Sequence, residues 1–170
     1  MNHVSELKNS MTDIVMDALG KVKDPEIASV SILDLGMVHE VYVTEGAVKV
    51  SVLPTFSGCP ALHIIERDIK KAIEEVEGIQ SVEVNFVFTP SWTTDRITPE
   101  GRERLKEFGI SPPPANHVMG EPWEIDCPYC GSTYVTMENI FGPTACRSIL
   151  YCKSCKNPFE AMKPVADMGL

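Results

Sequence analysis

Apolar residues in the first third of the chain recur first with the period of a helix and then with the period of strands. Between residues 10 and 22 they recur every three or four positions, which predicts an amphipathic helix that ends before Pro25. Residues 37–43 and 47–53 alternate between apolar and polar side chains on either side of a Thr-Glu-Gly turn. This pattern predicts a β-hairpin after the first helix.

The next stretch predicts a second helix and a third strand. Pro60 suits the first turn of a helix, and Gly78 suits the end of one. The apolar stripe of this helix consists of Leu62, Ile65, Ile69, Ile73 and Val76. Residues 82–88 alternate again and predict a strand. The resulting order, α-β-β-α-β, predicts a small α+β domain.

The remaining residues predict an extension, a linker and a smaller second domain. Thr98 followed by Pro99 is typical of a helix start, and we expect a short helix that ends near residue 108. Three prolines at 112–114 predict a stiff spacer. We therefore expect one domain over residues 1–110, a proline-rich linker over 111–122, and a β-rich domain over 123–170.

Two Cys-x-x-Cys hooks dominate the second domain. Cys127 and Cys130 form one hook, Cys152 and Cys155 form the other, and 21 residues separate them. Two facing hooks with strands between them are typical of a ribbon that holds one zinc ion with four thiolates. We expect the metal to supply much of the folding energy, since so short a segment buries little apolar surface. Cys146 is expected to pack outside the ligand set.

Other interpretations of these cysteines stay open. They can be free, or paired in disulfides within a loop-rich tail. Cys146, Cys152 and Cys155 have the spacing C-x₅-C-x₂-C, one residue away from a ferredoxin pattern. The Cys-Pro-x-Cys-Gly sequence of the first hook also occurs in iron-binding, rubredoxin-like hooks. An electron carrier with iron in the Cys₄ site is therefore one alternative function.

Cys59 is the candidate reactive residue of the first domain. It precedes the second predicted helix, whose free N–H groups favour negative charge, so we expect a modestly lowered thiol pKa. A small residue in a tight turn is the alternative. Asp24, Glu26 and Asp34 can gather nearby and act as acid–base groups, or simply cap and turn the loops.

Charge and hydropathy narrow the class of partner. The 170-residue chain has a net charge of −9, which argues against binding to nucleic acid. Charged residues are spread through its first 20 residues, which is unlike a secretory signal. No apolar stretch is long enough to span a membrane. We therefore expect a cytoplasmic protein with reduced thiols, no membrane contact and a protein partner.

Three short motifs of the first domain resemble the MIP18-like family, also called domain of unknown function 59. They are Asp-Pro-Glu-Ile at 24–27, Asp-Leu-Gly-Met-Val at 34–38 and Ser-Gly-Cys-Pro at 57–60. The family is associated with iron–sulfur cluster assembly, and its Gly-Cys-Pro cysteine corresponds to Cys59. The chain departs from many members at Ala28, where they have proline, and we expect the loop to stay intact.

The rest of the chain resembles the D subunits of phenylacetyl-CoA epoxidases. The shared motifs are SWTTD at 91–95, TPEG at 98–101, FGPTAC at 141–146 and NPF at 157–159. The resemblance implies a non-catalytic accessory subunit of this monooxygenase of aerobic phenylacetate breakdown. Its expected task is assembly or maturation of the iron–sulfur cluster of the reductase component.

The resemblance also implies cofactors and partners. Zinc in the ribbon and a transient iron–sulfur cluster are the expected cofactors. The reductase, the other subunits of the complex and a second copy of this chain are the expected partners. Oxygen chemistry belongs to a separate di-iron subunit, and this chain contains no Glu-x-x-His. A purely structural subunit that holds the oxygenase together is the other alternative.

Overall fold

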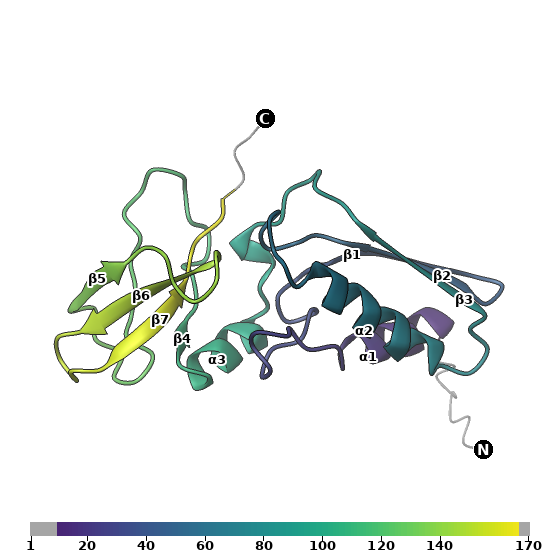
Figure 1. Ribbon diagram of the computed structural model, residues 1–170, viewed down its shortest axis with the longest axis horizontal. Helices are drawn as coiled ribbons and strands as arrows, with labels where there is room; N and C mark the ends of the chain where they lie inside the picture. Colours follow the sequence, from purple (N-terminus) through teal and green to yellow (C-terminus); the bar gives the residue numbers. More distant parts are fainter. Residues whose placement is uncertain (1–9, 167–170) are drawn as a thin grey trace, which may run out of the picture.

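The computed structural model describes residues 10–166 and shows an elongated chain with a β-sheet near each end (Figure 1). The first sheet and its helices comprise α1 (Met11–Leu19), β1 (Val38–Thr44), β2 (Ala47–Val52), α2 (Leu62–Glu74) and β3 (Ser81–Phe86). The middle comprises η1 (Thr94–Arg96) and α3 (Pro99–Glu107). The second sheet comprises β4 (Ile110–Ser111), β5 (Val135–Asn139), β6 (Arg147–Cys152) and β7 (Pro158–Met162).

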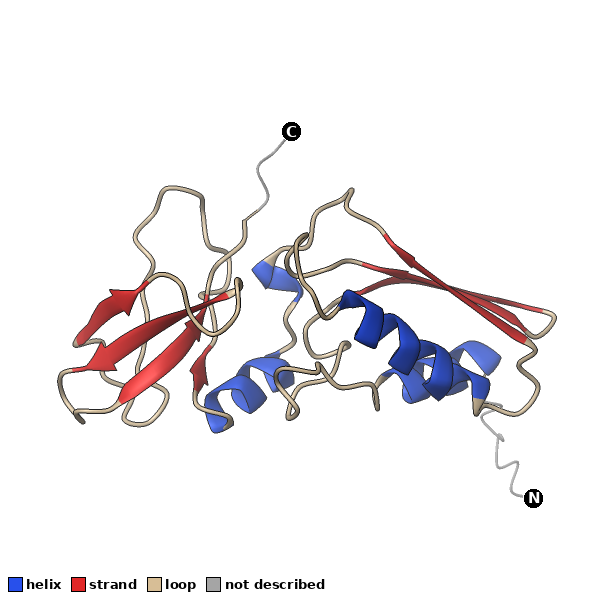
Figure 2. Cartoon of the chain, in the orientation of Figure 1, coloured by secondary structure: helices blue, strands red, loops and turns tan. Residues whose placement is uncertain are grey.

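The first sheet has the order β1-β2-β3. Strands β1 and β2 are antiparallel, and the turn residues Glu45 and Gly46 both have positive φ angles, which suit the twist of a tight hairpin. Strand β3 pairs parallel to β2, because α2 carries the chain back between them. Both α1 and α2 lie on one face of the sheet (Figure 2). This confirms the expected order α-β-β-α-β and the α+β class.

The alternating pattern of the strands sets the core of the first domain. Val48, Val50 and Val52 of β2 are buried, whereas Lys49 between them is exposed. The helix stripe of α2 meets them through Ile65, Ile69 and Ile73, all buried. Apolar side chains at a period of two on the strand and near 3.6 on the helix therefore face each other. This packing fixes where the loop that carries Cys59 leaves the sheet.

Helix ends agree with the sequence in part. Ser10 and Asp13 form a capping box at α1. At the start of α3 the Thr98 hydroxyl accepts the Gly101 N–H at 3.0 Å, and this cap was expected. The expected start of α2 at Pro60 is wrong by two residues, since the first helical residue is Leu62. Turns at residues 57–58 and 60–61 precede the helix instead. Cys59 lies between these turns, two residues before the N-cap Ala61.

The second sheet contains two strands that the sequence pattern did not reveal. Its order is β4-β7-β6-β5, and β7 pairs antiparallel to β6 and parallel to β4. Strand β7 begins three residues after the second hook, within a stretch too short to show a clear period. Strand β4 has two residues and carries no periodic signal at all. The second sheet therefore has four strands, with the second hook between β6 and β7 and the first hook in the loop before β5.

The two ends of the molecule are joined by more than a linker. Strand β4, at the boundary expected near residue 110, pairs with β7 of the ribbon. Met162 is buried in the core of the first domain, and Val165 packs against that core. The Val165 carbonyl oxygen also accepts the Thr94 N–H at 2.9 Å. The end of β7 therefore returns to the first domain.

The expected linker is held in place at several points. The Arg102 guanidinium donates to the carbonyl oxygens of Pro113 and Thr94. The Asn116 N–H donates to the Asp95 carboxylate at 2.7 Å. These contacts fix the first half of the linker against η1 and α3.

Among residues 10–166, no helix combines the length and apolarity that a membrane span requires.

Candidate functional site

The two cysteine hooks fold into matching turns. Gly131 and Lys156, the residues directly after the hooks, have positive φ angles of 71° and 64°. Their N–H groups donate to the carbonyl oxygens of Cys127 and Cys152, at 2.8 and 2.9 Å. The Cys155 N–H also donates to the Cys152 sulfur at 3.4 Å. Each hook therefore presents its two sulfurs from a closed backbone turn.

The sulfur atoms of the two hooks form one compact group. All four lie within 4.8 Å of one another, with Cys127–Cys155 and Cys130–Cys152 separated by 3.7 and 3.6 Å. These are not disulfides, whose sulfurs are about 2.05 Å apart. Zn–S bonds of about 2.3 Å place the corners of a tetrahedron about 3.8 Å apart. The group therefore has the dimensions of a tetrahedral metal site, and Cys146 lies outside it.

Little apolar surface supports the hooks. Cys127 and Cys152 are buried in a cluster whose other buried members are Ile125, Leu150, Phe159 and Ala161. This cluster is separate from the core of the first domain. A core of this size supplies limited folding energy, so a metal ion bound by the four cysteines would contribute a large share of the stability of the ribbon.

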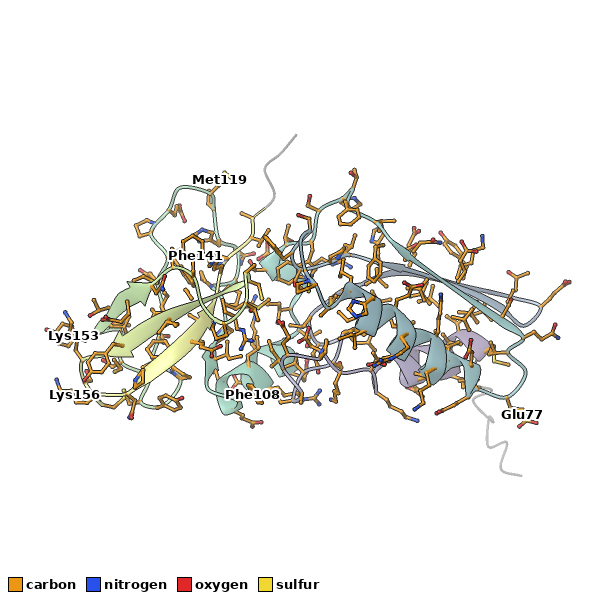
Figure 3. The ribbon with its side chains drawn as sticks, viewed as in Figure 1. Glu77, Phe108, Met119, Phe141, Lys153 and Lys156 are labelled. Atoms are coloured by element: carbon orange, nitrogen blue, oxygen red, sulfur yellow. The ribbon has the colours of Figure 1, made fainter. Side chains whose placement is uncertain are left out.

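The Cys₄ group lies far from the first sheet. Lys153 and Lys156, which flank the second hook, lie at one tip of the molecule, and Glu77 lies near the other (Figure 3). Cys59 therefore belongs to a different site from the hooks. That site lies between the first domain and the ribbon.

A cavity of about 300 Å³ brings the remaining candidates together. The loop after β2 contributes Cys59, the loop after α1 contributes Asp24 and Glu26, and the loop before β6 contributes Cys146. Phe56, Leu35 and Met162 supply apolar walls. Within residues 10–166, no Lys or Arg side chain lines this cavity. It therefore combines two thiols with two carboxylates.

The electrostatics of Cys59 differ from the sequence-based expectation. Burial raises the pKa of its thiol, and the Glu26 and Asp24 carboxylates and Cys146 raise that pKa further. The Ala61 N–H lowers the thiol pKa but is outweighed. The expected lowering was wrong, because burial of the thiol and the two nearby carboxylates outweigh the Ala61 N–H. The free Cys59 is therefore a protonated thiol at neutral pH.

Cys146 is held in a fixed turn on the other side of the cavity. Its sulfur lies 3.2 Å from the Thr144 hydroxyl oxygen, which accepts a hydrogen bond from Arg147 Nε at 2.9 Å. The Lys163 N–H donates to the Cys146 carbonyl oxygen at 2.8 Å. Burial raises the pKa of the Cys146 thiol, and Glu26 and Asp24 add to this effect. The Cys146 turn is thus fixed, and burial favours the protonated form of its thiol.

The three acidic candidates separate into two places. Asp24 Oδ1 accepts the N–H groups of Glu26 and Ile27 at 2.9 and 3.0 Å, and burial raises its pKa. Asp34 does not line the cavity. Its carboxylate accepts the Ser31 N–H at 2.8 Å and pairs with Arg104 at 2.6 Å. Asp34 therefore joins its loop to α3 and takes no part in the thiol site.

The sequence did not predict that Cys59 and Cys146 line the same cavity. The two cysteines come from loops of different sheets, so no local pattern connects them. The FGPTAC motif at 141–146 was the available signal, because it marked a turn with a cysteine at its end. Thr144 in that motif orients the thiol and was not singled out.

The described residues form an α+β domain joined to a ribbon with a Cys₄ group that could hold a metal ion. Residues 12–86 match the family described as iron-sulfur cluster assembly protein, and residues 111–163 match the PaaD zinc beta ribbon domain. The chain is 42% identical over 146 residues to the D subunit of the "Putative 1,2-phenylacetyl-CoA epoxidase" of Escherichia coli (strain K12), a match that spans 85% of this chain and 88% of that protein. The chain belongs to the family of these epoxidase D subunits.

Other relatives match the first domain alone. The "Fe-S protein maturation auxiliary factor YitW" of Bacillus subtilis (strain 168) is 33% identical over 93 residues, 54% of this chain and 90% of that protein. A crystal structure of a domain of unknown function DUF59 from Bacillus anthracis aligns with a TM-score of 0.53 and 29% identity, over 56% of this chain and 91% of that chain. These similarities confirm the MIP18-like interpretation of the first domain.

Proposed function

We propose that this protein is an accessory subunit of a phenylacetyl-CoA epoxidase and assists assembly of the iron–sulfur cluster in the reductase component of that complex. The name of the Escherichia coli relative supports the link to the epoxidase. The family of the first domain, and relatives named as Fe-S protein maturation auxiliary factors, support the link to cluster assembly. The protein itself performs no oxygen chemistry in this proposal.

One observation carries the proposal: Cys59 lies in a cavity with carboxylates, inside the domain that matches the iron–sulfur assembly family. In the proposed role, Cys59 binds the cluster during transfer and the ribbon docks the reductase. A single cysteine cannot complete the ligand set of a cluster. The reductase or a second copy of this chain therefore supplies further ligands.

The test is the cluster content of the reductase. A strain that lacks this protein is complemented with the wild type, with Cys59→Ser, or with the loop control Ser57→Ala. We expect the Cys59→Ser strain to yield reductase with reduced iron and sulfide content, and the Ser57→Ala strain to yield reductase with normal content. Cys59→Ser should itself retain its fold and its ribbon metal.

A reductase with full cluster content in the Cys59→Ser strain, with no redundant carrier present, would contradict the proposal. It would favour the structural subunit, whose loss disturbs association of the epoxidase and not its cluster. Copurification of the epoxidase subunits from the same strains separates these two functions. We propose the cytoplasm as the site of action, because none of the six cysteines, all within the described residues, forms a disulfide.

We also propose that zinc fills the Cys₄ group. The four sulfurs fit zinc, and they fit iron as well, so the electron carrier is the second candidate function. Metal analysis of protein purified without oxygen decides between them, since a zinc site is colourless and an iron–thiolate site is not. One zinc per chain in colourless protein is expected. One iron with a rubredoxin-like spectrum would establish the electron carrier instead.

A further inference from the structure

The cavity between the first domain and the ribbon contains a thiol from each. Cys59 lies in the turn between β2 and α2, and Cys146 lies in the turn that leads into β6. We propose that Cys59 and Cys146 together form a second metal site of this chain, which binds a thiophilic divalent cation of the ferrous iron class. This inference rests on the proposed role in cluster assembly, and it names the second protein ligand of that site.

The charges around the cavity favour a cation. Asp24 and Glu26 line it, and no basic side chain does so within the described part of the chain. The nearest guanidinium of this turn, Arg147, is engaged by Glu160 at 2.5 Å and by the Thr144 hydroxyl at 2.9 Å. A divalent cation that enters displaces two thiol protons to solvent and leaves two metal–sulfur bonds, so its charge is balanced by two thiolates.

Backbone hydrogen bonds hold the two turns that carry Cys59 and Cys146. The Cys146 turn is closed by the Arg147 N–H, which donates to the Thr144 carbonyl oxygen at 3.1 Å, and by Lys163 on the Cys146 carbonyl oxygen. The Cys59 turn is closed by its own N–H on the Phe56 carbonyl oxygen at 3.2 Å. Asp24 uses Oδ1 for backbone contacts, which leaves Oδ2 as a further oxygen ligand. Little backbone entropy is then lost when a cation binds.

The site differs from the ribbon site in being incomplete. Among residues 10–166, the hooks are the one group of three or more such side chains placed so that they could hold a metal ion. The cavity therefore offers two thiols and leaves coordination positions open. A closed Cys₄ set suits a structural metal, whereas open positions suit an ion or cluster that must leave again.

Cobalt(II) is the probe, because thiolate ligands give it intense charge-transfer absorption. Full-length protein with zinc retained in the ribbon is titrated with cobalt(II) without oxygen, and zinc is measured in the same samples. Wild-type protein should bind one cobalt with thiolate absorption and release no zinc. Cys59→Ser and Cys146→Ser should each weaken cobalt binding roughly 10-fold or more. Ser57→Ala should bind like the wild type.

A second measurement needs no variant. Cobalt(II) should slow alkylation of both Cys59 and Cys146 in the wild-type protein, as mass spectrometry of the peptides would show. If Cys146→Ser binds cobalt as tightly as the wild type, or if cobalt protects Cys59 alone, the two-thiol site is overturned. The proposed function is judged separately, by the cluster content of the reductase in the Cys59→Ser strain.

Discussion

Asp34 shows how one buried carboxylate can hold two segments together. Burial opposes its ionisation, but hydrogen bonds from Ser31 and the ion pair with Arg104 outweigh burial and lower its pKa. The neighbouring backbone is held as well, because the Asp34 carbonyl oxygen accepts the Thr98 N–H at 2.9 Å. Trp92 Nε1 donates to the Leu35 carbonyl oxygen at 2.7 Å. The loop is thus fixed by the extension that follows the first domain.

Replacing Asp34 tests this joint. Asp34→Asn removes the charge that Arg104 meets, and we expect a loss of about 1–2 kcal/mol in the free energy of unfolding at pH 7, measured with urea. Because the folded pKa is lowered, this stabilisation is present above the unfolded value of about 3.9 and is lost as pH falls through the folded pKa. The wild type and the variant should therefore converge in stability at strongly acidic pH. Glu100→Gln is the control, because Glu100 is exposed and lies on α3, the helix that carries Arg104.

Gly36 offers a second test of the same loop. Its φ angle is +63°, and an added Cβ would lie 2.1 Å from the Arg96 carbonyl oxygen. Gly36→Ala should therefore cost roughly 3 kcal/mol or more of unfolding free energy. Gly120→Ala is the matched control, because Gly120 also has a positive φ but its Cβ would meet nothing within 4 Å. That control should lose about 1–2 kcal/mol by urea unfolding. Equal losses would show that crowding at Arg96 is relieved at no cost.

At the scale of elements, sequence patterns served well where they were long. The spacing of apolar residues located α2, β2 and β3. The pattern is clear because the helix and the strands bury one face each in a common core. Local chemistry found the start of α3 through Thr98. The same approach failed for β4 and β7, whose strands are short and depend on their neighbours. The hooks were found because metal-ligand spacing is a local property.

The ribbon should depend on its metal. Removing the ion with a chelator under reducing conditions should unfold the ribbon and leave the first domain folded, because the cluster beneath the hooks is small. Trp123 packs against that cluster and Trp92 lies in the other core, so fluorescence distinguishes them. Chelation should red-shift the emission of the wild type and leave that of Trp123→Phe unchanged. A metal-free ribbon with native Trp123 emission would show that the metal is dispensable.

At the scale of the molecule, the meeting of the two ends was beyond sequence reasoning. The composition of residues 111–114 predicted a stiff spacer, and Ser111 at its start belongs to β4. Its contacts with Arg102 and Asp95 depend on the tertiary arrangement of η1 and α3, which no periodic pattern encodes. The same is true of the cavity, whose two thiols come from loops of different sheets. The Cys₄ group was predictable because its cysteines form two pairs, and the members of each pair are three positions apart in the sequence.

Independent folding of the first domain remains a prediction. We expect a chain of residues 1–110 to fold, because two helices and three strands enclose most of its core. It should be less stable than the full protein by about 3 kcal/mol, since it lacks Met162 and the pairing of β4 with β7. Thermal unfolding followed by circular dichroism measures this. Met162→Ala in the full chain should reproduce part of the loss, and Phe159→Ala, within the ribbon cluster, should leave the first domain unaffected. Aggregation of the truncated chain would mean that the two parts share one core.

The return of β7 to the first domain has a consequence for how the protein is made. Met162 and Val165 leave the ribosome after the whole of the first domain and the hooks, yet they pack against the core that begins with α1. Domains generally fold as units during synthesis, from the N-terminus onward. The first domain therefore gains its final apolar contacts, those with Met162 and Val165, only after β7 has been synthesised. Closure of the cavity that contains Cys59 is delayed in the same way, and no chain stalled before residue 146 can present both of its thiols.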